Sequence, residues 1–463
     1  MKQFTLMAGP LLALAAGGGL AVQGQPPDIA WTAAVTCLCA VWWIFEPIPI
    51  PATSLIPIAV LPLVGVLEPQ EVGAAYGDKI ILLLLGGLML SSAMEKSGAH
   101  RRIALTMVTA FGGSSSRRLV FGFMAASGVL SMWISNLATT LMLLPIVMAV
   151  VERVRQPRLR TALLLGVAYA ASVGGVGTPV GTPPNLIFMN NYEIAFGEDA
   201  APSFTEWMTW AVPVVAVMIP LVGLWLTRGL NEKEDIDLPE VGAWRTEEVR
   251  TLAVFAVTAL LWITRKEPGG GWSERLGIPA ASDASVALLG VVAMFLIPNG
   301  RRDEQGRQGR LLDWETAGRI PWGILLLFSS GIVIALGFAA SGLSQQLGES
   351  LAAVGGMPLL VLTGLMCLAV TFLTEVTSNT ATTNLLMPIL AAAATSAGID
   401  PRTIMVPAAI SASFAFMLPV ATGPNAVVFS SGQLTVREMA REGFALNLIG
   451  VVVVTLVCYL QFG

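Results

Sequence analysis

Long apolar stretches separated by short polar segments run along almost the whole chain. A membrane-spanning helix needs about 20 mainly apolar residues, and stretches of suitable length predict one span each. These spans are expected near residues 5–22, 29–46, 53–67, 79–97, 207–228, 251–264, 283–298, 321–340 and 443–461.

Two more apolar stretches, 159–192 and 402–431, contain glycine and proline in their middle. Proline lacks a backbone N–H and clashes with the preceding helical turn, and glycine disfavours the helix interior. The sequence therefore predicts a broken helix in each stretch, with the interruptions at residues 174–185 and 419–425.

The remaining apolar stretches, 119–151 and 357–396, carry a polar motif near their midpoint. The first lies between arginine-rich segments at 98–118 and 152–160, which the positive-inside rule places in the cytoplasm. Because it enters and leaves on one side, it predicts a re-entrant hairpin with Ser135–Asn136 at the tip. The second predicts a hairpin that enters from the opposite face.

The polar motifs of the two hairpins are near copies. Residues 135–146 read SNLATTLMLLPI, and residues 378–389, 243 positions later, read SNTATTNLLMPI. The Thr-Pro-Pro-Asn segment at 182–185 recurs as Thr-Gly-Pro-Asn at 422–425. Duplicated halves with interrupted apolar segments at matching positions are typical of secondary transporters. The sequence thus predicts about eleven transmembrane helices with two re-entrant hairpins and two broken helices in an inverted repeat.

The composition agrees with this pattern. Of the 463 residues, 55% are hydrophobic and 12% are charged, and the mean hydropathy is +0.74. These values exclude a soluble globular protein and predict an all-α multi-pass protein of the cell membrane, in contact with lipid. The small net charge of −4 is spread over loops, so we expect no nucleic-acid partner. The topology predicts a cytoplasmic N-terminus and an external C-terminus.

Residues for catalysis or for a transition-metal site are scarce. The only histidine, His100, lies in an expected cytoplasmic segment, and Cys37 and Cys39 have no further ligand nearby in the sequence. An intramembrane enzyme would need a nucleophile with a base, or a metal cluster. We therefore expect that the protein is not an enzyme.

The tips and interruptions place helix ends inside the membrane region. A helix N-terminus presents free N–H groups and a partial positive charge of about 0.5 elementary charge, so it binds anions without lysine or arginine. Carbonyl oxygens beside Gly181 and Ala421, with nearby hydroxyl and amide oxygens, are ligands that hard cations prefer. Packing of small residues is the alternative explanation, but two copies of the motif favour binding sites.

The chain resembles the divalent anion:sodium symporter (DASS) family, the bacterial INDY-type carriers of C4-dicarboxylates, over essentially its whole length. Besides the tip motifs and the interruptions, the similar stretches are Trp42–Trp43, Glu46–Pro49, Gly86–Gly87, Ala93–Lys96 and His100–Arg102. The resemblance implies a homodimer in which each subunit has a scaffold domain and an elevator-like transport domain. It implies scaffold helices at 1–97 and 201–340, transport-domain elements at 98–200 and 341–435, and a last membrane helix at 436–463.

The resemblance also implies roles for the motif residues. One sodium ion would bind Ser131, Ser135, Asn136 and the Gly181 backbone, and a second would bind Thr374, Thr377, Asn379 and the Ala421 backbone. The substrate carboxylates would meet Ser135, Asn136, Ser378, Asn379, Thr380, Thr422 and Gly423. Sodium would be the coupling ion for import of a dicarboxylate such as succinate or malate, and no further cofactor is implied.

Two positions depart from the family pattern. Leu137 stands where the first motif normally has threonine, and Gly423 stands where the second interruption commonly has proline. The first change removes a hydroxyl expected to face the substrate, so sulfate, citrate and other small anions stay open as substrates. Sodium-independent anion exchange is a further alternative. It would call for a cationic side chain in place of sodium, and neither motif contains one, which favours symport.

Overall fold

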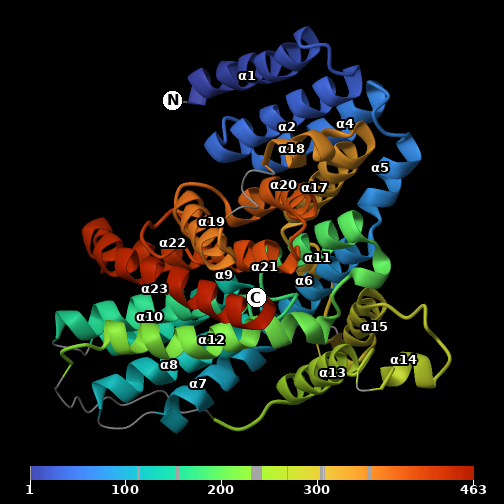
Figure 1. Cartoon of the computed structure of the whole chain (residues 1–463). Coiled ribbons are helices and arrows are strands. Elements are labelled where there is room, and N and C mark those ends of the chain that lie inside the picture. The colour runs from blue at the N-terminus through green and yellow to red at the C-terminus, as the bar shows by residue number, and fades with distance from the viewer. Residues whose placement is uncertain are drawn as a thin grey trace.

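The computed structural model describes residues 2–111, 115–152, 156–230, 242–267, 269–302, 306, 308–351 and 357–463. In this part of the chain, helices follow one another through short connections, and two short strands form a single hairpin (Figure 1). Six of the described helices are long and apolar enough to cross a membrane. The prediction of an all-α polytopic membrane protein is confirmed.

The N-terminal helices differ from the prediction at one place. The expected span at 53–67 is two short helices that meet at Ser54. Pro57 has no N–H to donate to the carbonyl of Thr53, so one helical hydrogen bond is missing at this point. The helices of this segment are α1 (Lys2–Val22), α2 (Pro27–Phe45), α3 (Ile50–Thr53), α4 (Leu55–Leu63), α5 (Pro69–Tyr76) and α6 (Lys79–Ser97).

The first hairpin and the first broken helix lie where the sequence predicts them. An additional helix in the preceding basic segment contains Arg102, whose buried side chain pairs with Glu248 (Nε to Oε2, 2.6 Å). Arg153 and Arg155 of the second basic segment lie outside the described residues. The elements are α7 (Ala99–Phe111), the hairpin helices α8 (Ser116–Ser131) and α9 (Asn136–Val151), the broken-helix halves α10 (Pro157–Gly175) and α11 (Pro183–Phe196), the 3-10 turn η1 (Glu198–Ala200), and α12 (Phe204–Leu226).

The middle of the chain connects the two repeats. Lys96 at the end of α6 bonds Asp313 (2.5 Å). Burial raises the pKa of Asp313, but hydrogen bonds from Lys96 and Thr316 outweigh it and hold that pKa at about 2. The strands, which the sequence did not predict, pair in antiparallel fashion. The elements are α13 (Thr246–Ile263), α14 (Gly271–Arg275), α15 (Asp283–Leu296), β1 (Pro298–Arg302), β2 (Gln308–Arg310), α16 (Trp314–Ala317) and α17 (Trp322–Ser341).

The second hairpin also lies where predicted, but the second interruption is longer than the expected 419–425. It begins at residue 412, and within it the N–H groups of residues 416–418 donate to side chains from other parts of the chain instead of to helical carbonyls. The elements are α18 (Leu343–Leu351), the hairpin helices α19 (Leu359–Thr374) and α20 (Asn379–Ala397), the broken-helix halves α21 (Arg402–Ser411) and α22 (Gly423–Ser430), and α23 (Val436–Phe462).

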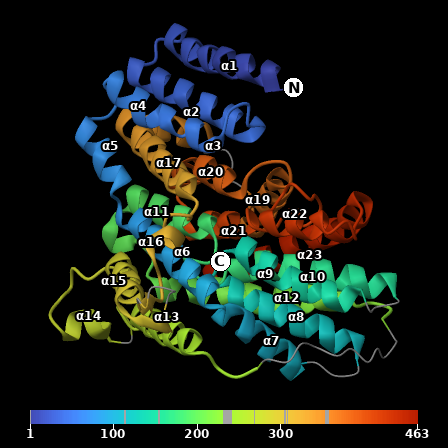
Figure 2. The same ribbon diagram turned by 180° about the vertical axis from the view of Figure 1, so that it is seen from behind.

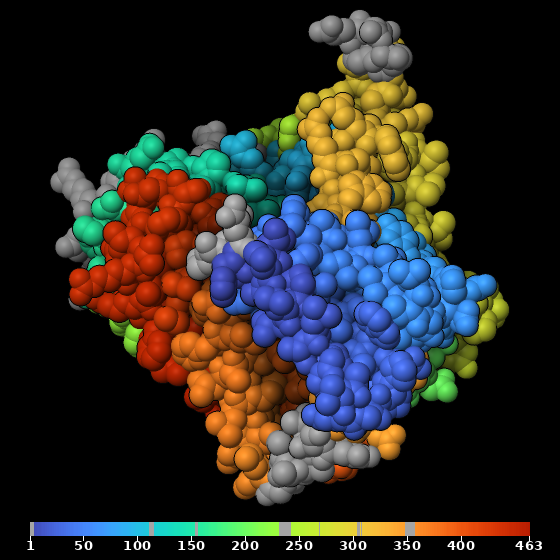
Figure 3. Space-filling view, turned by 90° about the horizontal axis from the view of Figure 1, so that it is seen from above, coloured from blue at the N-terminus to red at the C-terminus, as the bar shows by residue number. Residues whose placement is uncertain are grey.

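The two repeats interlock at the centre of the molecule. The second helix of each hairpin packs against the second half of the other repeat's broken helix, so that α9 lies against α22 and α20 against α11 (Figures 1 and 2). The N-terminal helices (blue) lie beside helices of the C-terminal half (orange) in Figure 3, in line with the packing of α2 and α4 against α17. Although residues 201–340 were expected to be scaffold, α12 packs mainly against α10 and α23, whereas α13 and α15 pack against α6.

Candidate functional site

The two hairpin tips end in the same kind of helix cap. The Ser135 hydroxyl accepts a hydrogen bond from the N–H of Ala138 (3.2 Å), and the Ser378 hydroxyl accepts one from Ala381 (3.5 Å). Serine is a favoured N-cap because its oxygen pairs an N–H that the helix leaves free. Helices α9 and α20 therefore begin at the tip asparagines, each with further N–H groups that have no partner within the helix.

Buried hydroxyl groups hold the tip asparagines from behind. Ser131 Oγ donates to Asn136 Oδ1 (2.6 Å), and Thr374 Oγ1 lies 2.7 Å from Asn379 Oδ1. The Thr374 hydroxyl also lies 2.9 Å from the carbonyl oxygen of Ala412. Because this hydroxyl carries a single proton, it donates to one of these oxygens at a time. Three oxygens therefore converge with one proton between them, an arrangement that suits a bound cation.

A second group of oxygens lies at the first interruption. A methyl group added to Gly181 would meet the carbonyl oxygens of Ser131 and Met132 at 3.0 Å and would collide with that of Gly175. The absence of a side chain at Gly181 lets these backbone segments approach so closely. A methyl group on Gly175 would in turn collide with the Asn136 amide. The tip and the interruption thus place oxygens from three segments next to one another.

One fully buried asparagine in each broken helix shapes the interruption. Asn185 Nδ2 lies within hydrogen-bond distance of the carbonyl oxygens of residues 175, 176 and 178, and Asn425 Nδ2 donates to those of residues 415 and 418 (3.0 Å each). These side-chain bonds satisfy carbonyls that a continuous helix would pair with N–H groups. The last residue of the Thr-x-Pro-Asn segment is therefore structural, whereas its threonine lies on the cavity described next.

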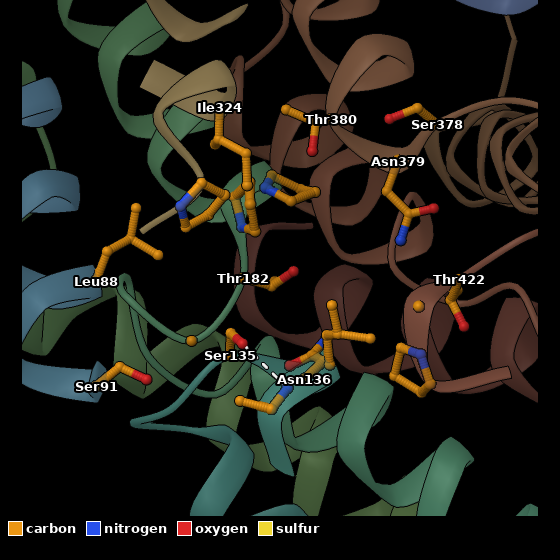
Figure 4. A pocket seen from close by; sticks show the side chains of 18 of the residues that line it. Leu88, Ser91, Ser135, Asn136, Thr182, Ile324, Ser378, Asn379, Thr380 and Thr422 are labelled. Carbon is orange, nitrogen blue, oxygen red and sulfur yellow. Dashed lines mark hydrogen bonds between the residues drawn. The ribbon is translucent and has the colours of Figure 1, made fainter. Parts of the chain in front are cut away.

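The tips and interruptions surround one cavity of about 1070 Å³ (Figure 4). Four helix N-termini reach its wall, because the N-cap residues of α9, α11, α20 and α22 all line it. Each N-terminus brings a partial positive charge toward the same space. The only basic side chains on the wall among the described residues are His100 and Arg319. Both belong to elements outside the tips and interruptions.

The structure brings the predicted site residues together. Every predicted substrate residue lines this cavity, namely Ser135, Asn136, Ser378, Asn379, Thr380, Thr422 and Gly423. Of the predicted sodium ligands, Ser135, Asn136, Gly181, Thr377, Asn379 and Ala421 line it, whereas Ser131 and Thr374 are fully buried behind the tips. What these residues bind stays a prediction.

Several charged residues of the cavity wall were not predicted as part of the site. Glu95, His100 and Arg319 line it at the ends of α6 and α16 and the start of α7, and Glu95 and Arg319 are exposed, so the cavity opens there. Burial lowers the pKa of His100, and Arg101 lowers it further, against a smaller upward effect of the bond to the Met94 carbonyl.

Glu46 also lines the cavity, at the point where a proline-rich segment follows α2. It is the only non-glycine residue with a positive φ (46°) among the described residues. A left-handed backbone conformation is uncommon at residues other than glycine, and the few examples cluster at functional sites. The sequence signal was the Glu-Pro pair at the end of an apolar helix, which alone does not distinguish a turn from a site.

Comparison with known proteins gives the chain its relatives. The family model for the sodium:sulfate symporter transmembrane region matches residues 21–462. The sodium-dependent dicarboxylate transporter SdcS of Staphylococcus saprophyticus is 39% identical over 462 residues, which cover 94% of this chain and 87% of the relative. A protein of the same name from Staphylococcus aureus is 37% identical over 477 residues, with 98% and 90% covered.

Two solved structures share the fold at low sequence identity. The YdaH transporter of Alcanivorax borkumensis has a TM-score of 0.62 at 16% identity, with 84% of this chain and 87% of that chain covered. MtrF of Neisseria gonorrhoeae has a TM-score of 0.61 at 16% identity, with 88% and 84% covered. The family model spans both repeats, and with the staphylococcal relatives it shows that this chain belongs to the sodium:sulfate symporter (DASS) family of membrane transporters.

Proposed function

We propose that the protein imports a small dicarboxylate, such as succinate or malate, together with sodium ions. The observation that carries this proposal is the convergence of four helix N-termini and two groups of oxygens on one cavity. The helix ends attract an anion, and the oxygens suit hard cations. The relatives in Staphylococcus that are 39% and 37% identical are named sodium-dependent dicarboxylate transporters, which supports the same assignment.

In this proposal, one sodium ion binds behind each tip. The first binds Ser131, Ser135, Asn136 and the Gly181 backbone, and the second binds Thr374, Thr377, Asn379 and the Ala421 backbone. Each tip asparagine presents its amide both to an ion and to the anion, so the two ligands share a side chain. Sodium then raises the affinity for the anion and the anion raises the affinity for sodium, because coupling between binding sites is reciprocal.

The carboxylates of the substrate bind the tips and the second interruption. The residues are Ser135, Asn136, Ser378, Asn379, Thr380, Thr422 and Gly423, all on the cavity wall. Hydrogen bonds from hydroxyl and N–H groups to a carboxylate are charge-assisted and are roughly twice as strong as those between neutral groups. The two carboxylates of one substrate are therefore held by elements of both repeats at once.

Transport requires the cavity to open alternately to the two sides of the membrane. We assign the moving unit to the hairpins, the broken helices, α12 and α23, which pack against one another, and the fixed unit to α1–α6 and α13–α17. The moving unit carries the site across the membrane as an elevator does. The protein works as a homodimer in the inner membrane, with its N-terminus cytoplasmic and its C-terminus external.

Uptake by the purified protein in proteoliposomes tests the proposal. Radiolabelled succinate, sulfate and citrate are offered in sodium or potassium at matched membrane potential. We expect concentrative succinate uptake in sodium alone. Equal succinate uptake in sodium and potassium would support exchange without sodium, and uptake of sulfate or citrate with no succinate uptake would contradict the dicarboxylate assignment.

A further inference from the structure

The two halves of the cavity wall differ although the repeats match. On α9 the lining residues after the tip asparagine are Leu137, Ala138, Leu141 and Met142, all apolar. The capping serines Ser135 and Ser378 line the wall at both tips, but at the second tip the residue that follows the asparagine in the lining is Thr380, which carries a hydroxyl group. Leu137 and Thr380 occupy the same position of the repeat, and Leu137 is 46% exposed to the cavity. One half of the site can therefore donate a hydrogen bond where the other presents methyl groups.

The apolar half depends on a second residue across the cavity wall. The three atoms nearest to the place of a Cβ on Gly423 all belong to Leu137, with Cδ1 at 3.1 Å and Cβ at 3.4 Å. The 3.4 Å contact is of ordinary van der Waals length, but at 3.1 Å the end of the Leu137 side chain would have to move by a few tenths of an ångström to make room for a methyl group. A side chain at position 423 would therefore displace the end of the Leu137 side chain.

The repeat-related pair shows the opposite arrangement. Thr380 corresponds to Leu137, and Pro183 corresponds to Gly423, while α20 packs on α11 as α9 packs on α22. Where the tip has the smaller threonine, the interruption has proline, and where the tip has leucine, the interruption has glycine. The larger tip residue thus goes with the smaller interruption residue, and the smaller tip residue goes with the larger one.

We infer that Leu137 and Gly423 act together as a specificity element that makes one half of the site accept only a dicarboxylate half without a hydroxyl group. This inference rests on the proposed function. A hydroxyl buried against Leu137 would lose its hydrogen bonds to water and gain none, which is costly. Succinate and malate can each place a hydroxyl-free half there. Tartrate cannot, because both of its halves carry a hydroxyl. The protein therefore selects C4-dicarboxylates with at most one hydroxylated half.

A double-mutant cycle tests the pairing. Gly423→Pro should raise the half-saturating succinate concentration about tenfold, because the ring pushes Leu137 into the cavity. In the L137T background the same change should cost less than about twofold. The backbone tolerates proline here, since Pro183 and Pro184 occupy the same helix positions in the first repeat and Thr422 has the same extended conformation as Thr182. Gly423→Ala provides a milder second variant with the same expected direction.

Selectivity is measured in the same proteoliposomes. Leu137→Thr should improve succinate affinity and raise tartrate uptake relative to succinate by about tenfold, because it restores a donor in the apolar half. Leu141→Thr, one turn further along α9, is the matched control and should show no coupling to Gly423→Pro. Additive effects in the cycle, or an unchanged tartrate-to-succinate ratio in L137T, would overturn the inference. If the wild-type protein takes up succinate neither in sodium nor in potassium, the proposed function itself is refuted.

Discussion

At the scale of single residues, the tip asparagines are the positions where we expect substitution to reduce transport most. Asn136 and Asn379 each accept a buried hydroxyl contact and line the cavity, so we propose that each serves an ion and the anion at once. Asn136→Ala and Asn379→Ala should each reduce sodium-driven succinate uptake at least about a hundredfold, because a charge-assisted hydrogen bond and a cation ligand are lost together. Membrane insertion and elution from size exclusion should stay normal. Asn299→Ala, on strand β1, is the control, and near-wild-type uptake in either tip variant would remove the site assignment.

At the scale of elements, the two interruptions show what a sequence can and cannot predict. The first was predicted closely because glycine and proline fill residues 174–184, and such residues break a helix locally. The second begins at 412, where no breaker stands. A few residues further on, the backbone of residues 416–418 is held by Glu375, Asn447 and Tyr169, which are distant in sequence. The tips were predictable because the repeat marks them, whereas the cavity-lining Glu46 belongs to neither repeat motif.

The same interruption leads to a stability prediction. The Glu375 carboxyl group accepts hydrogen bonds from the N–H groups of Met417 (2.8 Å) and Leu418 (3.0 Å) and from Asn447 Nδ2 (2.7 Å), and its side chain is buried. Glu375→Ala removes the carboxyl group that accepts these hydrogen bonds. The folded protein is then destabilised by about 1–3 kcal/mol for each donor that stays unpaired. We expect a loss of several degrees in the melting temperature of the purified protein. Glu267→Ala, at an exposed position, is the control. If Glu375→Ala melts at the same temperature as the wild-type protein, water replaces the carboxyl group.

At the scale of the whole molecule, the proposed orientation can be checked by labelling. The acidic segment with Glu198 is expected outside, and the basic segment with Gln308 on β2 is expected in the cytoplasm, by the positive-inside rule. In sealed cells, an impermeant thiol reagent should label Glu198→Cys and leave Gln308→Cys unlabelled until the cells are opened. The protein without either substitution controls for its own cysteines, of which Cys39, Cys367 and Cys458 are buried. Labelling of position 308 in sealed cells would reverse the orientation.

The whole molecule also contains a connection between the two proposed units at the end away from the cavity mouth. Lys79, at the start of α6, pairs with Glu193 of α11 (2.7 Å) and with Glu198 of η1 (2.8 Å). Glu95, near the other end of α6, lines the cavity mouth, and a helix of this length puts the two ends about 28 Å apart. Because α6 packs with α13 and α15 while α11 packs with α20 and α21, these ion pairs join the fixed unit to the moving unit.

Removing this connection should change the balance between the two conformations by a predictable amount. The partly buried pair of Lys79 with Glu193 contributes about 0.2–1 kcal/mol, so its loss favours the opposite conformation by up to about fivefold. In Lys79→Ala, a cysteine placed in the cavity by Leu141→Cys should therefore react faster by this factor with a reagent added from the Lys79 side, and high salt should shrink the difference.

Lys96→Ala is the matched control, because Lys96 pairs with Asp313 inside the fixed unit. The combination of Lys79→Glu with Glu193→Lys should bring the rate back toward that of the unaltered pair. If Lys79→Ala and Lys96→Ala react at the same rate at low salt, the ion pairs at this end do not hold the two units together.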